Sequence, residues 1–103
     1  MTQRSAFVLR VRPDKIDEYV DAHRNVWPEM LEALRGAGIR NYTIFRNGYE
    51  MFGYFESDDL EAVAASMEAQ DVNGRWQDTM AGLLEERVPD AGPHTLEEIF
   101  RLD

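Results

Sequence analysis

The sequence predicts a small α+β domain in which strands and helices alternate in the order β-α-β-β-α-β. Two apolar, β-rich runs, 42–45 and 51–55, flank Asn47-Gly48, a dipeptide typical of hairpin turns. Apolar residues at helical spacing precede this hairpin and follow it. The chain has 103 residues, enough for one hydrophobic core but not for two. We therefore expect a single domain over residues 1–103.

The first part of the chain is expected to form one strand and one interrupted helix. Ala6–Val11 is a strand-like run, and Pro13-Asp14 opens a helix with Asp14 as its N-cap. The inward stripe of this helix is predicted to comprise Ile16, Tyr19, Val20, His23 and Trp27. Pro28 disfavours a helical conformation for Trp27, so the helix should kink or restart there and end at the glycines of 36–38.

The second part of the chain completes the pattern. Ser57-Asp58-Asp59 is predicted to cap a second helical region, and Asp71 to cap a further one. Pro89–Pro93 should form a loop, and Glu97–Leu102 should close the chain as the last strand. This order is the ferredoxin-like arrangement, with helices on one face of an antiparallel sheet.

Large apolar side chains are expected on both faces of the hairpin strands. One face is predicted to carry Tyr42, Ile44, Phe52 and Tyr54, and the other Phe45, Met51 and Phe55. Because the helices cover only one face, the other would leave a wide apolar patch in water. We therefore expect a second copy of the chain to cover it in a homodimer.

Composition excludes several classes of function. The net charge of −9 argues against nucleic-acid binding, because phosphate recognition needs a cationic surface. The sequence has no cysteine, which excludes disulfides and thiolate chemistry and is compatible with the cytoplasm. It shows no secretory h-region and no apolar run near the ~18 residues of a membrane span. We expect a cytoplasmic protein without a membrane or nucleic-acid partner.

Few residues can carry catalysis. The sequence contains no GxSxG elbow and no glycine-rich phosphate loop, and its two histidines, His23 and His94, lack metal-ligand spacing. His23 lies four residues from Tyr19 and four from Trp27, so the three rings share a helix face if the helix continues. An imidazole titrates near ~6.5 and can donate or accept a proton at neutral pH. The alternative is a helix-face histidine hydrogen-bonded to a backbone carbonyl.

The other candidates are aromatic. Tyr19 and Tyr42 can hydrogen-bond a polyol, and Trp27 or Trp76 can stack on the C–H face of a sugar. For both tryptophans the alternative is an ordinary place in the core. For Tyr42 it is a strand residue with its ring in the core and its hydroxyl at the surface.

The chain resembles the L-rhamnose mutarotase family nearly end to end. The resemblance rests on Tyr19-x-x-x-His23-x-x-x-Trp27-Pro28-Glu29, with four further segments in the same order: Ala6-Phe7-Val8, Asn41-Tyr42-x-Ile44, Asp71-Val72-x-x-Arg75-Trp76 and Glu98-Ile99-Phe100. It implies a ferredoxin-like subunit that pairs into a dimeric α+β barrel, with the C-terminal segment helping the dimer. It also implies interconversion of the anomers of L-rhamnose without a metal or nucleotide cofactor.

The resemblance further implies roles for particular residues. His23 would be the catalytic acid, Tyr19 and Tyr42 would contact the sugar, and Trp76 with the following residue would line the pocket. That following residue is Gln77, where the family often has a second tryptophan. An amide in place of a flat ring changes which sugar hydroxyls are recognised, so rhamnose, fucose or another aldose fits the pocket.

Two rival functions belong to other classes. One is a cofactor-free monooxygenase or haem-degrading enzyme of the same dimeric barrel architecture. The other is a non-catalytic sugar-binding module that uses the same pocket.

Overall fold

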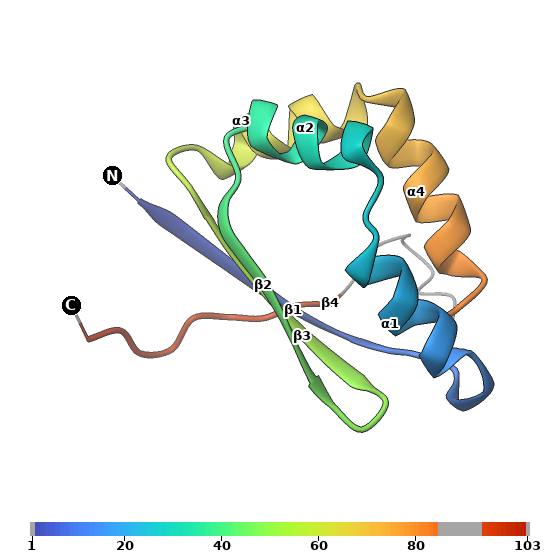
Figure 1. Cartoon of the computed structure of the whole chain (residues 1–103). Helices are drawn as coiled ribbons and strands as arrows, with labels where there is room; N and C mark the ends of the chain where they lie inside the picture. Colours follow the sequence, from blue (N-terminus) through green and yellow to red (C-terminus); the bar gives the residue numbers. More distant parts are fainter. Residues whose placement is uncertain (1, 85–93, 103) are drawn as a thin grey trace.

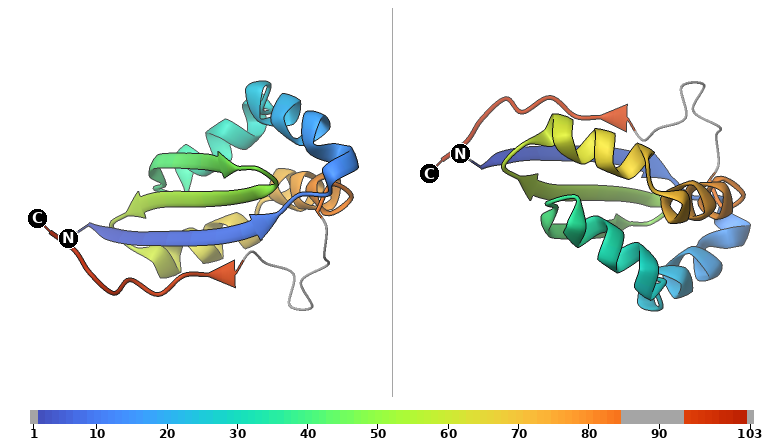
Figure 2. Two further views of the ribbon diagram at one scale, coloured as in Figure 1. Left: turned by 90° about the horizontal axis from the view of Figure 1, so that it is seen from below. Right: turned by 90° about the horizontal axis from the view of Figure 1, so that it is seen from above.

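The chain folds around a four-stranded antiparallel sheet with the strand order β2-β3-β1-β4. The computed structural model describes residues 2–84 and 94–102. The strands are β1 (Gln3–Arg10), β2 (Arg40–Asn47), β3 (Glu50–Ser57) and β4 (His94–Thr95). The helices lie together on one side of the sheet (Figure 1, Figure 2). The predicted ferredoxin-like α+β arrangement is confirmed.

The helical segments are η1 (Pro13–Lys15, a 3-10 turn), α1 (Ile16–Arg24), α2 (Pro28–Gly36), α3 (Leu60–Glu68) and α4 (Asp71–Ala81). The predicted interruption at Pro28 is confirmed, since Pro28 is the first residue of α2, where its fixed φ and missing N–H fit best. Trp27 precedes it with extended backbone angles, φ −56° and ψ 133°. The prediction that Trp27 continues the α1 stripe is therefore wrong.

One of the three predicted helix caps is confirmed. Asp59 caps α3, because its Oδ1 accepts the N–H of Ala62 at 3.1 Å. Asp14 instead lies inside η1, where its carboxylate pairs with the side chain of Arg12 at 3.4 Å. Asp71 is the first residue of α4 rather than its cap, and its charge at that end is favourable to the helix dipole.

The sheet faces differ from the prediction. The hairpin loop between β2 and β3 has two residues, 48 and 49, so paired residues have opposite parity, as in Phe45↔Phe52 and Thr43↔Tyr54. Even residues of β2 therefore share a face with odd residues of β3. The helix-facing side carries Tyr42, Ile44, Met51 and Phe55, and the open side carries Phe45, Phe52 and Tyr54. The prediction that both faces are apolar is confirmed, since Phe45 is 64 % and Phe52 39 % exposed.

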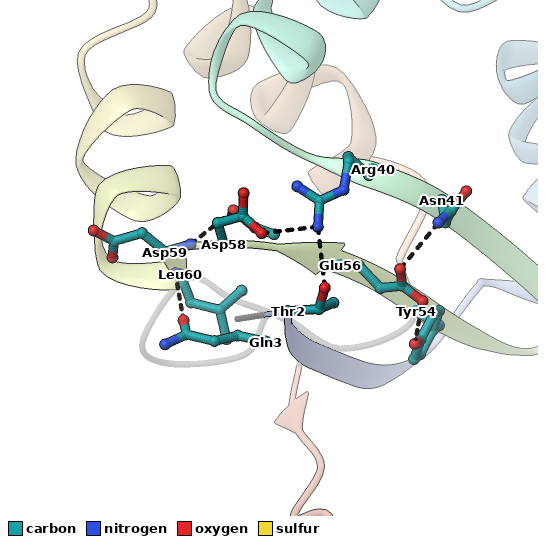
Figure 3. Close-up of polar contacts among 10 residues, drawn as sticks. Thr2, Gln3, Arg40, Asn41, Tyr54, Glu56, Asp58, Asp59 and Leu60 are labelled. Atoms are coloured by element: carbon teal, nitrogen blue, oxygen red, sulfur yellow. Dashed lines mark hydrogen bonds and ion pairs between the residues drawn. The ribbon is translucent and has the colours of Figure 1, made fainter. Parts of the chain in front are cut away.

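An irregularity at the start of β2 separates its first residue from the rest. The register against β3 shifts between Arg40 and Thr43, and Asn41 has the left-handed φ of 52°. Asn41 Nδ2 donates to Glu56 Oε1 at 3.0 Å, and Tyr54 Oη donates to Glu56 Oε2 at 2.6 Å (Figure 3). These bonds hold the pKa of Glu56 below its usual range.

The last strand differs in place and length from the prediction. β4 is His94–Thr95, which pairs with Val8 and Phe7 of β1, and Leu96 N donates to Ala6 O at 2.8 Å. Residues 97–102 form no strand, so the prediction of a strand at Glu97–Leu102 is wrong. The apolar side chains of this segment, Ile99, Phe100 and Leu102, are exposed. The predicted loop at Pro89–Pro93 lies outside the described residues.

The core lies between the sheet and the helices. Its buried members are Val11, Tyr19, Met30, Ala33, Met51, Val72, Trp76, Met80 and Leu83. Helices α1 and α4 thus contribute Tyr19 and Trp76, two of the predicted site residues, to the same cluster.

Candidate active site

A continuous series of aromatic rings joins α1 to α4. Tyr19 and His23 lie one turn apart on α1, with ring centroids 4.3 Å apart and planes tilted by 33°. The His23 ring meets Trp76 of α4 edge to face at 5.5 Å and 80°. Trp76 in turn meets Trp27 edge to face at 5.1 Å and 90°. The site thus places an ionisable ring between flat apolar ones.

The backbone of α1 fixes the tautomer of His23. Its Nδ1 lies 2.8 Å from the carbonyl oxygen of Tyr19, and a carbonyl can only accept a hydrogen bond. Nδ1 therefore carries a proton, and Nε2 is the nitrogen that gains or loses one. Within residues 2–84 and 94–102, Nε2 makes no hydrogen bond. The hydrogen bond to a backbone carbonyl, which the sequence analysis gave as the alternative to a catalytic role, is therefore present. It uses only Nδ1 and leaves Nε2 for proton transfer.

Two phenols approach this site from opposite layers. Tyr19 is 4 % exposed, and burial raises the pKa of its hydroxyl. Tyr42 reaches the helix-facing side from β2, and although 39 % of its surface is exposed, desolvation raises its pKa to about 12. The charge of an ionised Tyr42 raises the pKa of Tyr19 further. Both are neutral hydrogen-bond donors at physiological pH.

The ring of Tyr42 rests on two phenylalanines that the sequence did not single out. Phe7 of β1 lies edge to face with it at 6.2 Å, and Phe55 of β3 lies at 5.4 Å with planes tilted by 40°. The alternation of β1 and β3 places both on the helix-facing side, a signal that depends on a correct register.

Gln77 lies outside the ring series. It follows the buried Trp76 on α4, where a helix turns by about 100° per residue, and its side chain is exposed. Gln77 Nε2 donates to Asn73 Oδ1 at 3.3 Å. The structure thus brings together Tyr19, His23 and Trp76, places Tyr42 against Phe7 and Phe55 on the helix-facing side of the sheet, and leaves Gln77 at the surface.

Arg75 supports the ring series from outside. Its guanidinium lies 6.0 Å from the centroid of the Trp27 ring and donates to Asp71 at 3.0 Å and Glu29 at 3.2 Å. The four-residue spacing of Asp71 and Arg75 was visible in the sequence, but the contact with Glu29 bridges α2 and α4 and was not. The Arg75 side chain is about half exposed, so these ion pairs orient its guanidinium but add little to the stability of the fold.

Two surface hollows lie elsewhere. One of about 490 Å³ separates α2 from α4 beside Glu29 and Arg75, and one of about 350 Å³ lies between Tyr54 and the C-terminal residues 96–100. Neither includes a predicted site residue. In the described part of the chain, acidic and histidine side chains form no group of three that could hold a metal ion. No described helix is long and apolar enough to cross a membrane.

Comparison with known proteins decides the family. The family model of the L-rhamnose mutarotases matches residues 4–102. The chain belongs to this family.

Individual members agree with this assignment. The L-rhamnose mutarotase of Oceanobacillus iheyensis is 35 % identical over 98 % of this chain and 99 % of its own. The crystal structure of an L-rhamnose mutarotase from Formosa agariphila has a TM-score of 0.80 at 24 % identity, covering 98 % of this chain and 99 % of that one. A dimeric ferredoxin-like protein from an uncultured marine organism shares the fold, with a TM-score of 0.61 at 17 % identity over 98 % and 100 %.

Proposed function

We propose that this chain is a sugar mutarotase that interconverts the α and β anomers of L-rhamnose or a related 6-deoxy sugar. The observation that carries the proposal is the state of His23, whose Nδ1 is bound to the Tyr19 carbonyl while Nε2 faces no described hydrogen-bond partner. Membership of the L-rhamnose mutarotase family supports the same reaction.

The reaction needs two proton transfers and no redox change. A proton goes to the ring oxygen, one leaves the anomeric hydroxyl, and the bond between the anomeric carbon and the ring oxygen breaks to give an open aldehyde. Rotation about the bond next to the aldehyde and reclosure on its other face produce the other anomer. We propose that protonated His23 supplies the first proton from Nε2, with a gain of about 10²–10⁴ in rate. The base is Tyr42, a carboxylate or a water.

The surrounding residues suit a small polyol. The neutral phenols of Tyr19 and Tyr42 can hydrogen-bond sugar hydroxyls, and Trp76 offers an apolar face beside His23. Gln77 stays a predicted sugar contact, and its side chain is exposed.

We further propose that two copies of the chain pair through the open face of the sheet. Phe45 and Phe52 lie opposite each other there, and Ile99 and Phe100 of the C-terminal segment are 88 % and 78 % exposed. Apolar area of this kind is covered in most proteins. The dimeric state of a ferredoxin-like relative supports pairing through this fold. The cytoplasm stays the predicted compartment.

The test is His23→Ala, assayed by saturation-transfer NMR between the α and β signals of L-rhamnose and L-fucose. We expect catalysed exchange to fall to the spontaneous rate, because His23 is the proposed proton donor and no other ring of the series is an imidazole. The matched control is His94→Ala, the only other histidine, which should keep full activity. Full activity in His23→Ala would reject this histidine as the acid. Sugar contacts without accelerated exchange in the wild type would favour a binding module.

A further inference from the structure

The centre of the sheet contains a glycine that no side chain could replace without moving its neighbour. Gly53 of β3 lies directly opposite Phe7 of β1 and Ile44 of β2. A Cβ built on Gly53 would lie 2.1, 2.3 and 2.6 Å from three ring atoms of Phe7. The far end of the Phe7 ring therefore lies over the glycine backbone, in the space that the side chain of any other residue would occupy. Glycine within a strand is costly unless such an approach requires it.

The ring that occupies this space also supports Tyr42. Phe7 is 8 % exposed, and its ring meets that of Tyr42 edge to face at 6.2 Å. The contacts thus run from Gly53 through Phe7 to Tyr42, the residue to which the proposed function assigns a sugar contact.

We propose that Gly53 is a positioning residue for the mutarotase site, which lets Phe7 lie low enough to hold the hydroxyl of Tyr42 at its working height above the sheet. The inference rests on the proposed function, in which Tyr42 contacts the sugar. With any larger residue, Phe7 must move by roughly 1 Å or more to restore the ~3.5 Å contact between carbon atoms. The sheet closes one direction, so the ring moves toward the helices and displaces Tyr42. Misplacement by about 1 Å can lower a rate by ~10²-fold.

The experiment compares Gly53→Ala with Gly36→Ala, both as full chains. Gly36 ends α2, and a Cβ added there meets nothing within 4 Å. Values of kcat and KM for anomer exchange are measured by NMR at a temperature at which circular dichroism shows each variant folded. We expect Gly53→Ala to lose about 10- to 100-fold in kcat/KM and Gly36→Ala to match the wild type. Unchanged kcat/KM in folded Gly53→Ala overturns the proposal.

A double-mutant cycle separates positioning from packing. If Gly53 acts through the Tyr42 hydroxyl, Gly53→Ala has little further effect in a Tyr42→Phe background. An equal loss in both backgrounds means that Gly53 serves the packing alone, and the proposal fails.

Two further variants complete the design. If Gly53→Ala does not fold, Phe7→Leu removes the supporting ring without a clash and should lose kcat/KM to a similar degree. Full activity in folded Phe7→Leu overturns the proposal. His23→Ala is assayed in parallel. If it stays active, the proposed function fails; if it is inactive while Gly53→Ala is unaffected, only the positioning role fails.

Discussion

The two faces of the sheet are built from the same strands but carry different sets of side chains. On the helix-facing side, Phe7, Tyr42 and Phe55 form a group of ring contacts. On the open side, Phe45 and Phe52 lie opposite each other, and Tyr54, Glu56 and Asn41 form a hydrogen-bonded group (Figure 3). The helix-facing side thus carries the Tyr42 phenol, and the open side carries exposed phenyl rings.

Because side chains alternate along a strand, the residues of the proposed sugar site and those of the proposed subunit interface lie on opposite faces of the sheet. Neighbouring residues on one strand, such as Ile44 and Phe45, belong to different faces because strand side chains alternate. A substitution can therefore alter pairing of subunits without touching the site, or the reverse. Three further substitutions test this separation, from the largest expected effect to the smallest.

The largest effect is expected from Phe45→Asp on the open face. A carboxylate in a dimer interface loses the apolar contact and must be desolvated, and a two-fold interface repeats the loss. At about 2 kcal/mol or more per buried ring, two copies weaken the dimer by roughly 10³-fold or more. Sedimentation equilibrium measures the change. The matched control is Leu31→Asp on α2, which is 36 % exposed and should leave assembly unchanged. A dimer of unaltered affinity in Phe45→Asp would place the interface elsewhere.

An intermediate effect is expected from Tyr42→Phe on the helix-facing side. The folded state keeps the proton on Tyr42 to about pH 12, whereas an unfolded tyrosine releases it near ~10. Between these values the folded state binds more protons, so the free energy of unfolding falls as pH rises. Urea unfolding at pH 8, 10 and 11 should show a smaller alkaline loss for Tyr42→Phe than for the wild type. Tyr49→Phe, exposed beside the hairpin turn, is the control. Equal slopes in both variants would contradict the desolvated environment of Tyr42.

The smallest effect is expected from Arg75→Ala, at the outer edge of the ring series. Its two ion pairs are exposed, so we expect Tm to fall by less than about 5 °C and kcat/KM by less than about threefold. Arg12→Ala removes a comparable exposed pair that has no tryptophan beside it. Melting curves at low and high salt separate the two, because salt screens the ion pairs and leaves the contact with Trp27. Identical behaviour of both variants at all salt concentrations would show that Arg75 does not support the ring series.

Much of the fold was visible in short-range patterns. The break at Pro28 and the cap at Asp59 depend on a few neighbouring residues, and both are confirmed. The hairpin was also predicted, although Asn47 is the last residue of β2 and the loop begins at Gly48, with φ 63°. Such features depend only on residues close together in the sequence, so they can be predicted from it.

Features that depend on register were not visible. The close contact between Phe7 and Gly53 could be predicted only from the strand register, which places the two residues opposite each other. They are 46 positions apart in the sequence. The shift at Asn41 likewise involves Glu56 on another strand. For the site, helical spacing predicted Tyr19 beside His23, and family resemblance supplied Tyr42 and Trp76. The resemblance did not distinguish the two neighbours on α4, where Trp76 is buried and Gln77, turned by about 100°, is exposed.

Because His23 donates to the main-chain carbonyl of Tyr19, the main chain and the side chain of Tyr19 have separate roles. The main chain of Tyr19 sets which imidazole nitrogen exchanges protons, and its buried side chain packs against the His23 ring. Any residue that keeps α1 helical preserves the first property, whatever its side chain. Recognition of different sugars can therefore diverge at position 19 while the proton chemistry of His23 is inherited unchanged.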